Sequence, residues 1–256
     1  MNIKASFHYQ FEDHKKSILI FYFVLTCVYL LMLVSMTAVV SSTDPEMTTG
    51  NISGMNISTM IYVFIAGLCA FREAFGMLLQ NGVSRKTLFA GRTLTVLTIG
   101  LILPILDRIL ITVISLLNKL FGSNLGITSL FEQVYNQKVL GMSQFSLIIN
   151  SYFLDLFLYI AMMALGYMIT LVFYRLNKTG RIVVGAGFPI TFFILLPTLD
   201  SMFMNGRISL SLIKCIDTAY GFSAQQPSNA MITSACMFLV FSCFSWLLIR
   251  RANIKG

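Results

Sequence analysis

The stretch SILIFYFVLTCVYLLMLVSMTAVV, residues 17–40, carries no charged side chain over its 24 positions. A helix of this length crosses a hydrocarbon core about 30 Å thick, because each residue adds about 1.5 Å. It is also longer than the apolar core of a cleavable signal peptide, so we expect it to remain as a membrane span. Five further apolar segments of 21 residues or more follow it. The predicted spans are residues 17–40, 57–79, 93–117, 146–173, 182–203 and 229–249.

Basic residues are distributed unevenly between the segments that connect these spans. Twelve of the eighteen Lys and Arg lie in residues 1–16, 80–92 and 174–181 and in the C-terminal tail, which together have 44 residues. The three alternate connections have 69 residues and hold only four. Positive charge near membrane ends is retained in the cytoplasm. We therefore predict one all-α membrane domain over residues 1–256, with six transmembrane helices and both termini on the cytoplasmic side of the cell membrane.

The composition agrees with a membrane protein. Hydrophobic residues make up 57% of the chain, charged residues 11%, and the mean hydropathy is +0.81. The net charge of +8 would indicate nucleic acid as the partner of a soluble protein, but here the predicted topology and anionic membrane lipid account for it. We therefore expect no nucleic-acid partner. The five cysteines form no C-x-x-C pair, and no metal site is predicted.

Three connecting segments are predicted to contain helices of their own. Ile3, Phe7 and Phe11 recur at helical spacing, which predicts a short amphipathic helix over residues 1–16 at the inner interface; the alternative is a basic leader that only fixes topology. A capping-box pattern from Ser129 to Glu132 predicts an external amphipathic helix near 130–140. The apolar content of 204–228 predicts a short re-entrant or interfacial helix.

Two features of the spans themselves concern how they pack. Small residues in the second, fourth and fifth spans, such as Gly67, Gly166 and Gly185, permit close helix contacts. Pro189 and Pro197 are expected to bend the fifth span.

Charged residues inside the spans are candidate functional residues, because each costs about 2.5–3.5 kcal/mol at the membrane centre. They are Arg72, Glu73, Asp107, Arg108, Asp155 and Asp200. Arg108 and Asp155 each lie nine residues from the predicted outer end of their span, or about 13 Å deep. We therefore predict that these two interact. The charges either line a substrate path or form interhelical ion pairs that hold the bundle together.

Known catalytic motifs are absent from the sequence. It has no H-E-x-x-H, no G-x-S-x-G and no G-x-x-x-x-G-K-[ST], so we expect no metalloprotease, hydrolase or nucleotide-binding activity and assign no catalytic residue. The inner turn over residues 80–92 is the sharpest local signal. Asn81 and Gly82 suit a helix end, and Ser84 suits the cap of a short basic helix that contains Arg85, Lys86 and Thr87.

The six-span plan, the helix before the first span and the apolar insertion between spans five and six resemble the permease subunit of ABC-2 type exporters. The stretch NGVSRKTLF, residues 81–89, is similar to the start of the coupling helix in that family, and FYRLNKTG, residues 173–180, resembles the fourth-to-fifth connection of small stand-alone permeases of Gram-positive bacteria. The resemblance implies that Asn81, Gly82, Ser84, Arg85, Lys86 and Thr87 couple the chain to an ATPase.

The same resemblance implies the partners. They are two copies of a separate ABC ATP-binding subunit, which would hold ATP and Mg, and a second permease copy or paralogue, with no cofactor in this chain. The implied activity is export of a hydrophobic or amphipathic cargo, such as a peptide, toxin, bacteriocin or drug. Two other classes remain open. An intramembrane enzyme would need clustered Glu and His in the spans, where this chain has only Glu73, and a non-transport assembly or sensor subunit would need neither.

Overall fold

The computed structural model describes residues 3–42, 51–120 and 126–250, and these residues are almost entirely helical. The predicted all-α fold is confirmed. Five of the described helices are long and apolar enough to cross a membrane, which fits the predicted membrane class. The main helices are α1 (Ile3–Ser42), α2 (Met55–Cys69), α3 (Arg72–Gln80), α4 (Arg85–Leu120), α7 (Gln144–Arg175) and α12 (Pro227–Arg250). A two-residue parallel strand pair joins β1 (Asn51–Ile52) to β2 (Gly126–Ile127).

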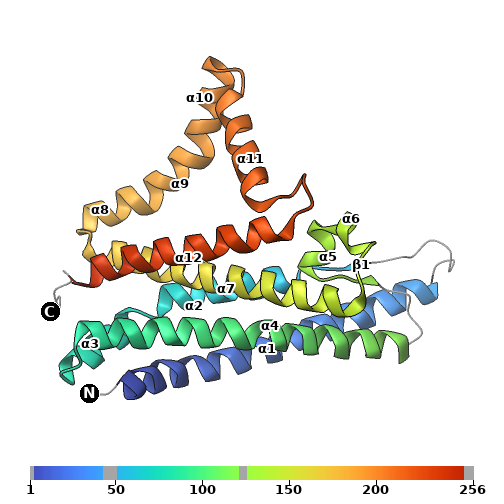
Figure 1. Ribbon diagram of the computed structural model, residues 1–256, viewed down its shortest axis with the longest axis horizontal. Coiled ribbons are helices and arrows are strands. Elements are labelled where there is room, and N and C mark those ends of the chain that lie inside the picture. The colour runs from blue at the N-terminus through green and yellow to red at the C-terminus, as the bar shows by residue number, and fades with distance from the viewer. Residues whose placement is uncertain (1–2, 43–50, 121–125, 251–256) are drawn as a thin grey trace.

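The long helices α1, α4, α7 and α12 and the shorter α2 form an elongated bundle (Figure 1). Helix α7 lies at its centre and packs against α2, α4 and α12, while α1 packs on α4. The contact between α2 and α7 is close because it is built on glycine. A methyl group on Gly67 would meet the carbonyl oxygen of Met163, and one on Gly166 would meet that of Phe64. The predicted role of these two glycines in helix packing is confirmed.

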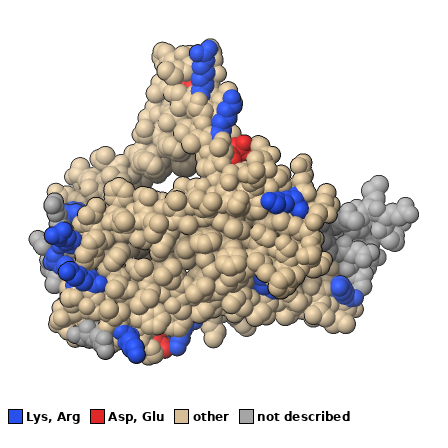
Figure 2. Space-filling model, in the orientation of Figure 1, with Lys and Arg blue, Asp and Glu red and all other residues tan. Residues whose placement is uncertain are grey.

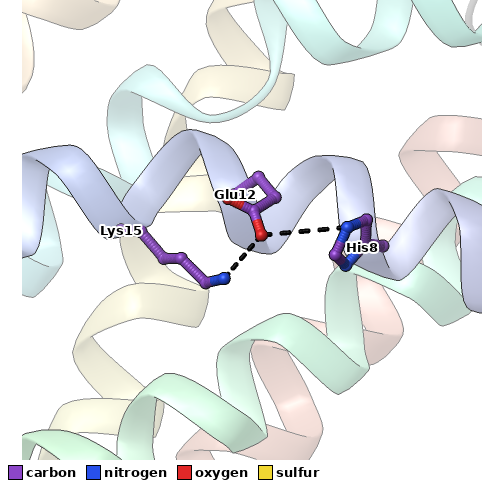
Figure 3. Close-up of polar contacts among 3 residues, drawn as sticks. All are labelled: His8, Glu12 and Lys15. Carbon is purple, nitrogen blue, oxygen red and sulfur yellow. Dashed lines mark hydrogen bonds and ion pairs between the residues drawn. The ribbon is translucent and has the colours of Figure 1, made fainter.

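The predicted boundary between a leader helix and the first span is wrong, because α1 is one continuous helix of 40 residues. Its charged stretch contains no helix breaker, and Glu12 contacts both Lys15 and, at 3.8 Å, His8 on the same face of α1 (Figure 3). The buried stripe also differs from the predicted one. Ser6, Gln10 and His14 are buried at helical spacing, whereas Ile3 is exposed.

The predicted second span, 57–79, is interrupted. Helix α2 ends at Cys69 and α3 begins at Arg72, with a turn at residues 70–71. Phe71 and Phe75 are buried in a cluster with Tyr167 and Leu171 of α7, so tertiary packing overrides the uniform apolar pattern at this point. With 15 residues, α2 is about 22 Å long and does not by itself match the length of a full span.

The predicted separate helix between the second and third spans is also wrong, because α4 runs unbroken from Arg85 to Leu120. The predicted cap is confirmed: the backbone N–H of Thr87 donates to Ser84 Oγ at 3.2 Å. Gly91, the weakest helix former between Arg85 and Arg92, lies within the helix and does not end it, so the basic turn continues directly into the apolar helix.

The segment between α4 and α7, which the sequence predicts to be external, contains two short helices, α5 (Leu130–Val134) and α6 (Asn136–Val139), in place of the single one predicted near 130–140. The capping box of Ser129 and Glu132 is confirmed. The interruption falls at Tyr135, whose buried hydroxyl donates to the Tyr220 carbonyl at 2.7 Å. Burial raises the pKa of Tyr135 to about 12, so the hydroxyl stays a neutral donor at physiological pH.

An arm rises from the bundle between α7 and α12 (Figure 1). Its first limb is the helical segment Lys178–Phe203, and its second limb is α11 (Arg207–Tyr220), which confirms a helix within 204–228. The first limb contains, in order, α8 (Lys178–Ile182), η1 (Val183–Gly187), α9 (Phe188–Ile190), η2 (Thr191–Leu195) and α10 (Leu196–Phe203). Each π-helical stretch lies just before a proline-containing turn, consistent with the missing N–H groups of Pro189 and Pro197.

Candidate functional site: a basic end and a buried carboxylate cluster

The basic junctions lie together at one end of the bundle. Helix α1 begins, α12 ends, and the α3–α4 and α7–α8 turns all lie at this end (Figure 1), and Figure 2 shows Lys and Arg side chains there on the visible face. The segments are also tied to one another, because Arg85 Nη1 donates to the Arg250 carbonyl at 2.7 Å. We call this region, from the start of α1 to the end of α12, the basic end.

The turn between α3 and α4 is held firmly at the basic end. Gly82 has φ +73°, a conformation that favours glycine, and Val83 is buried against Phe75 and Leu88. Asn81 Nδ2 donates to the Met77 carbonyl at 3.0 Å.

The predicted coupling residues therefore have different positions. Asn81, Gly82, Ser84 and Thr87 shape the turn, and Arg85 ties it to α12. Lys86 is exposed and forms none of these contacts, so it is the residue of the six that is free to meet another surface.

Two buried carboxylates lie inside the bundle. Asp107 on α4 is fully buried and accepts hydrogen bonds from the hydroxyls of Tyr22 at 2.7 Å, Thr59 at 2.9 Å and Tyr159 at 2.6 Å. Asp155 on α7 is buried as well, and its Oδ2 accepts from Asn56 Nδ2 at 2.7 Å.

The hydrogen bonds around Asp107 and Asp155 connect four helices directly and a fifth, α5, through Asn56. We call Tyr22, Asn56, Thr59, Asp107, Asp155 and Tyr159 the carboxylate cluster. Its members come from α1, α2, α4 and α7. The Asn56 side-chain oxygen also accepts the backbone N–H of Leu130 at 3.2 Å, which attaches α5 to the cluster. The arrangement fixes the relative positions of the helices.

The predicted interaction between Arg108 and Asp155 is not a direct ion pair: within the described ranges no contact of 4 Å or less joins their charged groups, and the Arg108 charge acts on Asp155 only from a longer distance. Asp107 and Arg108 are adjacent on a helix and point about 100° apart, so the burial of Asp107 directs Arg108 elsewhere. Arg108 lines a groove of about 690 Å³ between α4 and α7, together with Thr112, Glu132 and Tyr152. Arg108 and Asp155 were predicted to interact because they lie at equal depth, but depth does not determine on which face of its helix a side chain lies.

The remaining intramembrane candidates have other positions. Asp200 in α10 accepts backbone N–H groups from Ile208 at 2.9 Å and Ser209 at 2.7 Å, and so caps the first turn of α11. Arg72 and Glu73 lie in α3, but their side chains are outside the described part of the structure.

One buried contact was not anticipated from the sequence. Arg92, which the sequence suggested only as a topology signal, is buried in α4, and its Nη1 contacts His14 Nε2 at 2.7 Å. The polar stripe of Ser6, Gln10 and His14 is the signal that could have indicated a partner on α4. Likewise, isolated polar residues in apolar spans, such as Thr59 and Tyr159, could have marked the carboxylate cluster.

No group of three or more His, Cys, Asp or Glu that could hold a metal occurs in residues 3–42, 51–120 or 126–250. Comparison with protein-family models, curated proteins and solved structures found no match to this chain.

Proposed function

We propose that this chain is the membrane subunit of an ATP-driven exporter of the ABC-2 type, with the ATPase supplied by separate subunits. The observation that carries the proposal is the basic end. A firmly held turn presents Lys86 there, beside the start of α1 and the end of α12. A basic rim suits docking of a protein with an acidic or polar surface, since such charges mainly steer association and set its register.

The geometry also supports a way to transmit a movement. The turn leads without a break into α4, a helix of 36 residues whose Asp107 contacts α1, α2 and α7. A displacement at the turn would therefore be passed along a helix that is hydrogen-bonded to the other helices. The cargo we propose is hydrophobic or amphipathic, because the described grooves between the helices are lined mainly by apolar side chains.

In this proposal the chain crosses the cell membrane six times, with α2 and α3 together forming the second crossing and both termini in the cytoplasm. A second copy or paralogue would complete the exporter. The arm supports this part, because its first limb exposes large apolar side chains, including Phe188, Phe193 and Phe203, that need a cover of lipid or protein.

Orientation is tested by thiol labelling of whole cells. The five native cysteines, all exposed, are replaced, and single cysteines are then placed at four exposed positions. An impermeant reagent should label positions 138 and 205 and spare positions 84 and 178. Labelling of position 84 from outside would reverse the proposed orientation and place the basic end away from any cytoplasmic ATPase.

Coupling is tested with Lys86→Glu, which leaves the Arg85 contact to Arg250 in place. The ATPase that co-purifies with the wild-type chain is reconstituted with each variant, and binding and cargo-stimulated ATP hydrolysis are measured. We expect Lys86→Glu to lower both. Lys119→Glu, at the other end of α4, is the matched control and should leave both unchanged.

The same preparation discriminates the alternatives. Wild-type coupling by the correctly inserted Lys86→Glu variant would contradict docking at this turn. Peptide hydrolysis without any ATPase would support an intramembrane enzyme, and the absence of both a stoichiometric ATPase and hydrolysis would support an assembly or sensor subunit.

A further inference from the structure

A small cavity lies between α4, α7 and α12, away from the carboxylate cluster. Its polar lining consists of Arg92, Thr93, Tyr167, Ser242 and Ser245, and apolar side chains including Phe89 and Phe238 complete it. The space accommodates about one water molecule or an ion of similar size. The cavity belongs to the bundle itself, so a ligand bound there does not depend on the proposed transport function.

Unpartnered hydrogen-bond donors are concentrated at this cavity. Nε and Nη2 of Arg92, the hydroxyl of Tyr167 and the hydroxyl of Ser245 are all buried without a hydrogen-bond partner. They make up four of the nine buried side-chain nitrogen and oxygen atoms that have no hydrogen-bond partner in the described chain, although the cavity is lined by only a few side chains. Buried polar groups are nearly always paired in folded proteins, so four orphans at one place indicate a missing acceptor.

Arg92 also brings a positive charge that has no carboxylate in direct contact with it. It is 2% exposed, and its guanidinium lies 5.2 Å from the centre of the Tyr167 ring. The remaining terminal nitrogen, Nη1, contacts His14 Nε2 at 2.7 Å. Because arginine can only donate, His14 must accept through a neutral nitrogen and adds no negative charge. Within the described residues no carboxylate lies within 4 Å of Arg92, and the exposed Asp13 acts on it only from a longer distance. A buried cation without a directly paired counter-ion is unfavourable.

The chemistry of the lining selects the ligand. A water molecule has two lone pairs and no charge, so it would satisfy only part of a set of four donors and would leave the guanidinium unbalanced. A small anion accepts from all of them and neutralises Arg92. We propose that Arg92, Tyr167 and Ser245 form a binding site for a small inorganic anion of about the size of chloride. The bound anion joins α4, α7 and α12 at a single point.

Anion binding is measured on the purified wild-type chain in detergent. Thermal stability is followed as sodium chloride replaces sodium gluconate at constant ionic strength. A ligand that binds only the folded state raises stability with its concentration, so we expect the midpoint of unfolding to rise with chloride and to follow a binding curve. Bromide in place of chloride should give anomalous scattering beside Arg92 in crystals.

Two conservative variants assign the effect to this cavity. Tyr167→Phe and Ser245→Ala each remove one donor, and a hydrogen bond to a charged group contributes enough to weaken anion binding about tenfold or more. Tyr152→Phe is the matched control, because Tyr152 lines a different groove, and it should keep the wild-type chloride dependence. Arg92→Gln should abolish the dependence of thermal stability on chloride. If this variant does not fold, the Tyr167→Phe and Ser245→Ala variants still test the site.

Three results would overturn the site. The first is equal stability of the wild-type chain in chloride and gluconate at every concentration. The second is stabilisation by chloride at the same concentrations in the wild-type chain, Tyr167→Phe and Ser245→Ala, because the stabilisation would then be a general salt effect. The third is stabilisation by vesicles or micelles containing phosphatidic acid but not by chloride, which would assign the guanidinium to a lipid headgroup.

Discussion

Tyr159 and Asp107 join α7 to α4 through a hydrogen bond of 2.6 Å from the tyrosine hydroxyl to Asp107 Oδ2. The same hydroxyl lies 3.4 Å from the carbonyl oxygen of Asn56 in α2. Both Tyr159 and Asp107 are buried, so neither can exchange this contact for water. The bond is therefore a connection on which the arrangement of three helices depends.

Removing that hydroxyl should destabilise the bundle. Tyr159→Phe leaves one carboxylate oxygen of Asp107 without its donor, and the expected loss in free energy of unfolding is about 1.5–3 kcal/mol. The measurement is chemical unfolding in mixed micelles. Tyr152→Phe is the control, since its hydroxyl bonds the Leu101 carbonyl at 3.2 Å at an exposed position. Equal losses for the two variants would contradict a special role for the buried contact.

Asp155 should be coupled more strongly to Asn56 than to Arg108. Asn56 Nδ2 contacts Asp155 Oδ2 at 2.7 Å, whereas Arg108 faces a groove outside the cluster. Two double-mutant cycles test this, one combining Asp155→Asn with Asn56→Ala and the other combining it with Arg108→Gln. The first should be clearly non-additive, with a coupling energy of about 0.5–3 kcal/mol, and the second should show a smaller coupling. A larger coupling to Arg108 would restore the ion pair that the sequence suggested.

The helices and their locations were largely predictable, because apolar length and local capping depend on neighbouring residues. Helix α7 matches the predicted span within a few residues, and the Ser129–Glu132 capping box is present as expected. The interruption at residues 70–71 was not predictable, since it depends on the packing of Phe71 against α7.

Side-chain partners were harder to predict than helices. The depth of Arg108 follows from counting residues, but its direction depends on which face of α4 meets α1, α2 and α7. For the same reason the burial of Arg92 could not be predicted, because the sequence does not distinguish Arg92 from the neighbouring Arg85 and the exposed Lys86.

The glycine contact between α2 and α7 should not tolerate a methyl group. In Gly67→Ala the new Cβ would overlap the Met163 carbonyl oxygen. This oxygen belongs to the backbone of α7, so it cannot rotate away as a side-chain atom can. We expect a loss of about 1–3 kcal/mol or a reduced yield of folded protein. Gly76→Ala in α3 is the matched control, because open space surrounds that position. It should be neutral or stabilising by up to about 1 kcal/mol, since alanine favours helix more than glycine. A tolerated Gly67→Ala would mean that the two helices are farther apart.

The last prediction concerns the tip of the arm, where Asp200 of α10 caps α11. One carboxylate oxygen accepts the N–H of Ile208 and the other that of Ser209. These two amides belong to the first turn of α11, whose N–H groups have no partner within the helix. A negative charge at this position also interacts favourably with the positive end of the helix dipole.

Asp200→Ala should therefore release the first turn of α11 without unfolding the bundle, because the described contacts of Asp200 lie within the arm. The cap contributes about 0.5–2 kcal/mol, so the amides of residues 208 and 209 should exchange with deuterium several-fold faster. Asp200→Asn keeps one side-chain oxygen acceptor and should give an intermediate rate. Asp217→Ala is the control at the other end of α11, where Asp217 accepts the N–H of Ser223 at 2.9 Å, and it should speed exchange only near residue 223. Unchanged exchange at residues 208 and 209 in Asp200→Ala would show that another group holds the tip, and the buried position of Asp200 would then need a different explanation.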